Sequence, residues 1–522
     1  MITIRAGRQR PKDRKPTESD KTTAGRTKTY NAPINGLVTA TTKGSGTGAV
    51  VLDNFWPTPT GIEPRGGAAR IGTASTRIRT LFEHRATGAK FAATATQILP
   101  FTDSALGAAA VSGLTGGEWI TFEVQNAGGS NLIAVNGADT ARRFDGTAWS
   151  TASITGVAST SLSYVWGHRN RVFFIQGNTL SAWYLGTNSI GGAATELPLS
   201  AVFRNGGRLI AGATWSSDSG DGMDDRCVFI TDAGEVAVFS GSNPGDINSW
   251  SLVGVYEVGP ILGPKAITSL AGDLVFATTA GLIPLSGAVQ KDPAELASVS
   301  ISAPVSPDWQ AESAVFGVAW RIALWDKGRM IAAVPIGSSR QLAANVETNA
   351  WCRITGWTCS DLCSLGGGLY MADMDGGLFR AWYGGSDDGD PVICRAMLAH
   401  DHLDAPASIK IARMVRPVFR HIGDLHFRVS VSANYSEDFP PLPDTVSDIS
   451  AAAEGLWDVS DWDTTAWASE SMSYRVRSRW EVVAGAGESL GVQIQILTNS
   501  AQRVPLQLQR IDLLYDLGGI GL

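Results

Sequence analysis

Short stretches of alternating apolar and polar residues, separated by glycine-rich turns, make up most of the chain. In HFRVSVS, the side chains of Phe427, Val429 and Val431 share one face of a strand. Arg428 and Ser430 share the opposite face, and this period of two is the pattern of a half-buried antiparallel strand. Long runs of helix-forming residues at helical spacing do not occur in the sequence. The pattern therefore predicts an all-β protein.

One hairpin motif recurs along the chain, with a short strand, a turn that usually contains glycine and, in three copies, a tryptophan. GEVAVFSGSNPGDINSW, at residues 234–250, is the clearest copy. The turn glycines of the copies are Gly146, Gly186, Gly241, Gly287 and Gly384. Their spacing gives a loose period of roughly 40–55 residues, which is typical of β-propeller blades. We therefore predict a β-propeller of about six to eight blades over residues 65–390.

Tryptophans occur at similar offsets after three of these turns, as Trp149, Trp250 and Trp351. A four-stranded blade has two apolar faces, and radial stacking of the blades buries both. A packing position recurs with the repeat, whereas a single binding site does not. We therefore expect these tryptophans to pack between blades rather than to stack on a carbohydrate or a base.

Beyond residue 391 the alternating strands become longer. They occur within residues 408–436, 472–500 and 504–519. Alternation of this length is typical of antiparallel sheets that are buried on one face. The sequence therefore predicts an antiparallel β-sandwich or platform domain over residues 391–522.

A loop at residues 437–467 interrupts this domain and is rich in proline and aspartate. It contains Trp457, Trp462 and Trp467. Exposed tryptophans in an acidic loop form an apolar patch, which fits a partner surface. The same residues fit a cover over one end of the sandwich, so both interpretations stay open.

The distribution of charge along the chain is uneven. Charged residues make up 17% of the 522 residues, below the roughly 25% that is usual for soluble domains, which suggests that partners cover much of the surface. The net charge is −7, yet residues 1–30 contain nine Lys or Arg and three Asp or Glu. This segment has almost no apolar residues and cannot fold alone.

The basic segment is expected to be an extended N-terminal arm. It is either solvated or docked on an acidic neighbour, such as another copy of the chain. In the docked interpretation its basic residues contact a neighbouring subunit or an adaptor, and the candidates are Arg5, Arg8, Arg10, Arg14 and Lys15.

Targeting and disulfide signals are weak. The N-terminus lacks the apolar core of a secretory signal, and no segment approaches the ~18 apolar residues of a membrane span. The five cysteines are scattered, which predicts reduced thiols in a cytoplasm rather than a disulfide scaffold.

Motifs for catalysis, cofactors and metals are not evident. The sequence has no HExxH, P-loop or GxSxG motif, and FDGTAW does not have the spacing of a sialidase Asp-box. The histidines His400 and His402 do not form a complete ligand set, and the cysteines Cys352, Cys359 and Cys363 lack a fourth ligand. We therefore predict a non-enzymatic protein without cofactor or metal, although a separated carboxylate pair leaves no sequence motif.

Three stretches of the chain have a distinctive sequence: NFWPTPTGIEPRGGAARIGT at residues 54–73, and the stretches at residues 229–267 and 272–286. They resemble tail nozzle (tail tubular) proteins of short-tailed, podovirus-like bacteriophages. The C-terminal LLYDLGGIGL also resembles the ends of such chains. The resemblance is most specific over residues 229–286, and it rests on structural segments rather than on catalytic motifs.

The resemblance implies a homohexameric ring below the portal and the adaptor (head-to-tail connector) ring. Further partners would be tail fibres or a needle, and the location would be the virion, after assembly in the host cytoplasm. In such proteins the propeller lies outside and a β-rich platform builds the tube, to which residues 31–64 are expected to return.

The resemblance also implies that viral double-stranded DNA passes through the lumen without sequence-specific binding. A basic lumen would hold phosphates by counterion release, so we expect a neutral or negative one. Two alternatives remain, a propeller glycan depolymerase and a host-receptor-binding tail protein.

Overall fold

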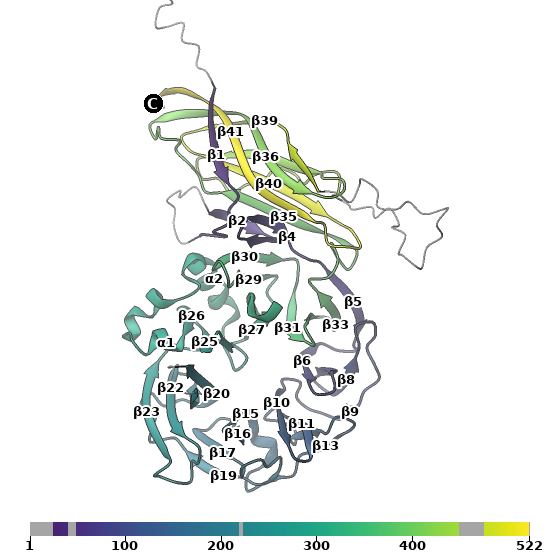
Figure 1. Ribbon diagram of the computed structural model, residues 1–522, viewed down its shortest axis with the longest axis vertical. Helices are drawn as coiled ribbons and strands as arrows, with labels where there is room; N and C mark the ends of the chain where they lie inside the picture. The colour runs from purple at the N-terminus through teal and green to yellow at the C-terminus, as the bar shows by residue number, and fades with distance from the viewer. Residues whose placement is uncertain (1–24, 40–47, 219–222, 448–473, 521–522) are drawn as a thin grey trace, which may run out of the picture.

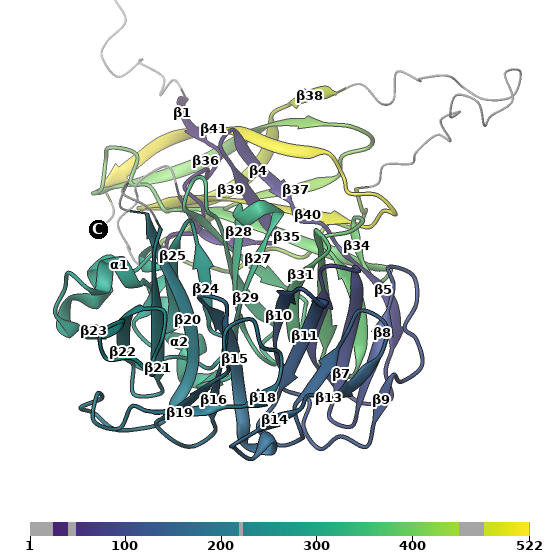
Figure 2. The ribbon, with the colours of Figure 1, turned by 60° about the horizontal axis from the view of Figure 1, so that its bottom comes forward.

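The computed structural model describes residues 25–39, 48–218, 223–447 and 474–520. It consists of a ring of antiparallel β-meanders and a platform of longer strands at one side of the ring (Figure 1). The tilted view in Figure 2 shows the strands of the meanders standing side by side around the ring, with the platform next to them. The predicted β-propeller with a β-rich platform is therefore confirmed.

Five meanders form separate sheets. Four of these have four strands each: β6 (Ile78–His84), β7 (Ala89–Thr94), β8 (Gln97–Phe101) and β9 (Val111–Ser112); β10 (Ile120–Asn126), β11 (Gly129–Val135), β12 (Arg142–Phe144) and β13 (Trp149–Thr151); β15 (Leu162–His168), β16 (Arg171–Gln176), β17 (Ser181–Tyr184) and β19 (Thr195–Pro198); β20 (Leu209–Asp218), β21 (Met223–Thr231), β22 (Glu235–Gly241) and β23 (Trp250–Glu257). The fifth has three: β24 (Ile267–Leu270), β25 (Asp273–Thr278) and β26 (Gly281–Pro284). A short parallel pair, β14 (Ile154–Thr155) and β18 (Gly192–Ala193), joins the loops of the second and third sheets.

Two further meanders belong to a 13-stranded sheet that continues into the platform. Their strands are β27 (Trp320–Trp325), β28 (Met330–Pro335), β29 (Arg340–Asn345) and β30 (Ala350–Thr355), and β31 (Cys359–Leu365), β32 (Gly368–Asp373), β33 (Gly377–Ala381) and β5 (Ala68–Thr73). Strand β5 pairs antiparallel with β33, so the first propeller strand of the chain completes the last meander. Within the described ranges the ring thus has seven meanders, inside the predicted range.

Helices replace a fourth strand after β26. They are α1 (Leu285–Ala288), η3 (Pro293–Val299), η4 (Ala303–Val305) and α2 (Ser306–Phe316), and the shorter turns η2 (Ser159–Ser161) and η5 (Asp326–Gly328) lie elsewhere in the ring. The sequence analysis assigned Gly287 to a hairpin turn, and this was wrong because Gly287 lies inside α1. Trp309 is the buried residue of α2 and packs against Trp320, with 4.9 Å between ring centroids.

Two of the three repeat tryptophans pack as predicted. Trp149 contacts Phe82 and Phe91 of the preceding meander. Trp250 packs on Phe173, also in the preceding meander.

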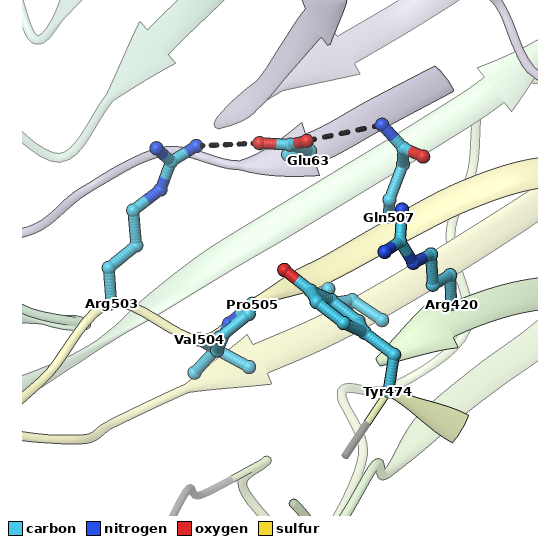
Figure 3. A pocket seen from close by; sticks show the side chains of 8 residues that line it. Glu63, Arg420, Tyr474, Arg503, Val504, Pro505 and Gln507 are labelled. Carbon is cyan, nitrogen blue, oxygen red and sulfur yellow. Dashed lines mark hydrogen bonds and ion pairs between the residues drawn. The ribbon is translucent and has the colours of Figure 1, made fainter. Parts of the chain in front are cut away.

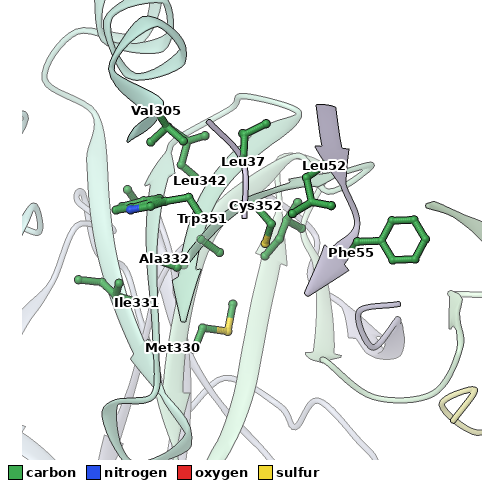
Figure 4. Close-up of a cluster of buried hydrophobic side chains, with 14 of the residues drawn as sticks. Leu37, Leu52, Phe55, Val305, Met330, Ile331, Ala332, Leu342, Trp351 and Cys352 are labelled. Atoms are coloured by element: carbon green, nitrogen blue, oxygen red, sulfur yellow. The ribbon is translucent and has the colours of Figure 1, made fainter. Parts of the chain in front are cut away.

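Trp351 differs from this pattern. Its indole N–H donates to the carbonyl of Ile301, and its ring contacts Trp309 in α2. Figure 4 shows it in a cluster with Leu37 and Leu52 from the N-terminal segment. Trp351 therefore packs under the helices and the N-terminal segment rather than between blades.

The platform contains strands from both ends of the chain. One sheet holds β1 (Arg26–Asn31), β3 (Phe55–Thr58), β4 (Gly61–Pro64), β36 (Ser408–His421), β38 (Arg475–Ser478), β39 (Glu481–Gly487) and β41 (Leu506–Ile520). The platform part of the 13-stranded sheet holds β2 (Ala49–Asp53), β34 (Ser386–Asp387), β35 (Asp390–Leu398), β37 (Phe427–Ala433) and β40 (Leu490–Thr498). Phe419 on β36 and Phe427 on β37 join these sheets through a ring contact at 4.9 Å.

The N-terminal strands pair directly with the C-terminal ones. Strand β1 pairs antiparallel with β41, and β2 pairs antiparallel with β35. Residues 26–30, which the sequence analysis assigned to the extended arm of residues 1–30, form β1 instead. Tyr30 is buried there, and the hydroxyl of Thr29 donates to Asp512 at 2.7 Å. The tethering of β1 by these contacts keeps it in the sheet.

Candidate functional sites

A cavity of about 500 Å³ lies between the first strands of several meanders, around the propeller axis. Its charged lining side chains come from segments that are far apart in sequence, because each meander contributes the start of its first strand. Arg77 precedes β6, Glu118 precedes β10, Lys265 precedes β24, Arg321 is in β27 and Asp361 is in β31. A cavity of this size fits a small molecule.

A buried ion pair forms one side of the axial cavity. Asp361 is fully buried and pairs with Arg321. The backbone amides of Leu81 and Leu362 donate to the same carboxylate at 2.6 and 3.1 Å. Burial opposes the charge of Arg321, but Asp361 outweighs it and raises the pKa of the guanidinium. Asp361 is thus a fully engaged structural carboxylate.

Lys265 forms a second ion pair at the cavity. Its ammonium lies 3.0 Å from the Glu118 carboxylate and donates to the hydroxyl of Thr80 at 2.7 Å. It also donates to the carbonyl of Arg79 at 3.2 Å. These contacts link the loop before β24 to strand β6 across the ring.

The outer face of the platform sheet carries a row of arginines along β36. Arg413 pairs with Asp516, and Arg416 pairs with Asp512, each at 2.7 Å. Burial would raise the pKa of Asp512, but hydrogen bonds from Thr29 and Arg416 hold it below its usual range. The row is therefore largely neutralised by β41.

A smaller pocket of about 260 Å³ lies where β4 meets the start of β41. Figure 3 shows Glu63 between Arg503 and Gln507, and its carboxylate accepts from them at 3.1 and 3.2 Å. The guanidinium of Arg420 lies over the ring of Tyr474 at 3.9 Å. The pocket is thus lined by charged groups that already have partners.

Exposed valines mark the edge of the platform sheet. Val476 on β38 and Val482 on β39 are 67% and 82% exposed. In the part of the chain that the structure describes, β38 and β39 hydrogen-bond to β36 alone; β38 has no strand paired on its other edge, whereas β39 also packs beside β37. A free strand edge with apolar side chains can pair with another chain.

The side chains that the sequence analysis proposed as subunit or adaptor contacts lie outside the described residues. These are Arg5, Arg8, Arg10, Arg14, Lys15, Trp457, Trp462 and Trp467.

The histidines and cysteines have ordinary structural surroundings. His400 and His402 both contact the ring of Tyr435. All five cysteines are buried and free, and Cys352, Cys359 and Cys363 are among them. No group of three or more His, Cys, Asp or Glu side chains in the described ranges is placed to hold a metal ion. Of the helices described, none is both long and apolar enough to cross a membrane.

The sequence analysis missed the axial cavity. Its charged residues have no common motif, since ring closure brings them together. The one available signal was the presence of Arg77 and Arg79 at the start of a predicted strand, where buried apolar residues are expected.

Protein-family models and curated proteins give no match to the chain. Among solved structures, a streptogramin B lyase is 11% identical, with 60% of this chain and 97% of that chain covered and a TM-score of 0.39. The β-propeller domain of Cps50 (Swd1) from Myceliophteria thermophila is 10% identical, with 60% and 99% covered and a TM-score of 0.39. YCF48 bound to D1 peptide is 11% identical, with 61% and 95% covered and a TM-score of 0.38. These likenesses bear on the propeller fold alone.

Proposed function

We propose that the protein is a structural subunit of a phage tail nozzle, which assembles as a homohexameric ring and forms part of the channel for DNA ejection. The observation that carries the proposal is the platform. Strands β1 and β41 pair in one sheet, and β38 and β39 at the border of that sheet present the exposed side chains of Val476 and Val482. An edge of this kind supports association with a neighbouring copy.

The small size of the axial cavity favours a DNA passage between subunits over a passage through each propeller. At about 500 Å³ it has the size of a small-molecule pocket, and the Arg321–Asp361 pair lies in its wall. In the proposed ring, DNA passes through the central opening that six platforms enclose. The adaptor ring, the tail fibres or a needle, and the virion location belong to the same proposal, and the role is structural rather than catalytic.

The test is the stoichiometry of the full chain and of two matched variants. Val482→Glu places a charge on the proposed subunit edge, and Ile247→Glu places one on a 90% exposed position of the propeller. We expect sixfold rings for the wild type and for Ile247→Glu, and monomers for Val482→Glu, because a buried unpaired carboxylate opposes association. Light scattering after size-exclusion chromatography and negative-stain images measure the outcome.

Other outcomes favour the alternatives. If the wild type is a monomer or a trimer that binds host glycans, the proposal of a receptor-binding tail protein replaces that of a nozzle. Cleavage of host polysaccharide by the purified chain would favour a propeller glycan depolymerase. Rings that form equally well with Val482→Glu would leave the hexamer in place but exclude the β38–β39 edge as its interface.

A further inference from the structure

The axial cavity holds more positive charge than its ion pairs neutralise. Lys265 pairs with Glu118, and Arg321 pairs with Asp361. Arg77 lines the same cavity, and Arg79 follows it at the start of β6. In the part of the chain that the structure describes, neither of these two arginines has an ion pair or a side-chain hydrogen bond to another residue. The lining therefore includes one guanidinium group, that of Arg77, without an ion pair of its own, and Glu118 and Asp361 offset its charge from a distance.

The buried polar atoms left without a partner at this cavity are all donors. Among the described lining residues they are the Nε atom of Arg77 and the indole Nε1 of Trp320. Buried donors without acceptors cost free energy, so a ligand that supplies acceptors is favoured. The two carboxylates at the cavity, in contrast, are occupied, since Asp361 accepts from Leu81 and Arg321 and Glu118 accepts from Lys265.

The electrostatics of Arg77 point the same way. Burial lowers its pKa, and the neighbouring Arg79 lowers it further, although Glu118 and Asp361 oppose the shift. An anion beside Arg77 would offset the cost of burying its charge and replace lost hydration.

We propose that the axial cavity binds a small dianionic molecule, and that an organic phosphate monoester of about the size of a sugar phosphate is the class that fits. A phosphate monoester carries a charge of about −1.5 to −2 at neutral pH and three acceptor oxygens, which can accept from the Arg77 guanidinium and the Trp320 indole. Guanidinium groups bind phosphate through paired N–H donors. Ile120, Trp320 and Ile336 supply an apolar wall for the remainder of the molecule. This site is additional to the proposed tail function and does not depend on it.

The test is calorimetric titration of the full chain with glucose 6-phosphate, glucose, inorganic phosphate and succinate at low and moderate salt. We expect saturable binding of glucose 6-phosphate and weak or absent binding of glucose. Arg77→Gln should weaken the binding of glucose 6-phosphate by about tenfold or more, the cost of one charge-assisted hydrogen bond. The matched control is Arg85→Gln, whose side chain is exposed at the other end of β6 and which should bind as the wild type does. Circular dichroism of each variant establishes that the fold is retained.

Several results would overturn the proposal. They are absence of saturable binding of every anion, equal binding of glucose and its phosphate, or the same loss in Arg77→Gln and Arg85→Gln. Tighter binding of succinate would replace the phosphate assignment by a dicarboxylate. A 5′-phosphorylated oligonucleotide that displaces glucose 6-phosphate with higher affinity would assign the cavity to nucleic acid instead. If Arg77→Gln does not fold, Arg77→Lys takes its place, because it keeps the charge but loses the paired N–H donors, and it should also weaken binding.

Discussion

Arg65 illustrates how single residues hold the propeller to the platform. It is 1% exposed, and its guanidinium forms two hydrogen bonds to Asp387, at 2.6 and 3.0 Å. It also donates to Asn54 at 2.7 Å and lies over the Trp357 ring at 4.3 Å. A buried cation of this kind is stable only while its partners remain, because an unpaired buried charge is strongly unfavourable.

Loss of the Asp387 charge should therefore destabilise the junction. We expect Asp387→Asn to lower the free energy of unfolding by about 3 kcal/mol, because Arg65 stays buried without its counter-charge. Asp388→Asn is the matched control, since Asp388 pairs with the exposed Arg70 and its loss should cost less than about 1 kcal/mol. Urea unfolding monitored by tryptophan fluorescence measures both. Equal effects of the two variants would contradict the role of the buried pair.

Three buried histidines should make stability depend on pH. Burial lowers the pKa of His168, His400 and His421. The unfolded imidazoles bind protons near pH 6.5, whereas the folded ones bind them at lower pH. The free energy of unfolding should thus be highest above about pH 6.5 and fall as the pH decreases towards 5.

His168→Gln tests this dependence at one position. His168 is enclosed by hydrogen bonds to Thr214 and to the Gly241 carbonyl. Between pH 6.5 and 5, the free energy of unfolding of the variant should depend less steeply on pH than that of the wild type. The difference in slope should be up to about 1.4 kcal/mol per pH unit, because one protonation step is removed. Thermal unfolding across this pH range gives the slopes. A variant with the slope of the wild type would contradict the prediction.

At the scale of elements, strand β5 closes the ring. It pairs with β33, which lies at the other end of the propeller segment, and the turn before β5 passes close to β34. Gly67 lies in that turn, where a Cβ atom would stand 1.9 Å from the carbonyl oxygen of Ser386. The closure therefore requires glycine at this position.

Gly67→Ala should open the ring locally. We expect it to lower the free energy of unfolding by about 2 kcal/mol or more, since backbone must shift to relieve the overlap. Hydrogen exchange should rise in β5 and β33 before it rises in the other meanders. Gly128→Ala, at an exposed turn where a Cβ would meet the Asn126 side chain at 3.3 Å, should leave both quantities near wild-type values. If hydrogen exchange in Gly67→Ala rises equally in all meanders, the proposed role of Gly67 in local ring closure is contradicted.

At the scale of the whole molecule, the first and the last described strands, β1 and β41, belong to the same platform sheet. Strand β1 adds to β41 over residues 26–31, and the basic residues that precede it are therefore attached at the platform rather than at the propeller. This arrangement separates two effects that the sequence could not distinguish, namely the charge of the arm and the pairing of its last residues.

Two truncations should separate these effects. Removal of residues 1–24 should leave the unfolding transition unchanged, because every described contact stays, while ring assembly weakens if the arm docks on a neighbour. Removal of residues 1–31 should also lower the free energy of unfolding by about 3 kcal/mol or more, because the buried Tyr30 and the pairing with β41 are lost. Thermal unfolding and light scattering report on the two effects. Equal unfolding transitions in both truncations would contradict the role of β1.

The sequence predicted the parts of the fold that repeat. Alternation and turn spacing identified the meanders, and the positions of Trp149 and Trp250 follow from the repeat. The helix α2 was missed because Trp309 is its buried residue, so it has no apolar stripe of helical period. Its flanking signals, Pro307 near the start and Gly317 at the end, were present in the sequence. The axial charges could not be predicted because closure of the ring, not sequence proximity, brings Arg77, Lys265 and Asp361 together.

The pairing of β1 with β41 has a consequence for synthesis on the ribosome. The partner of β1 is translated long after β1 itself, so β1 leaves the exit tunnel long before it can pair. Closure of the ring is delayed in the same way, because β5 pairs with β33, which is translated much later. Such long-range pairings slow folding and leave strand edges exposed in the nascent chain. We therefore expect chains that end before β41 to aggregate, and chaperone capture to be strongest just before β41 leaves the ribosome.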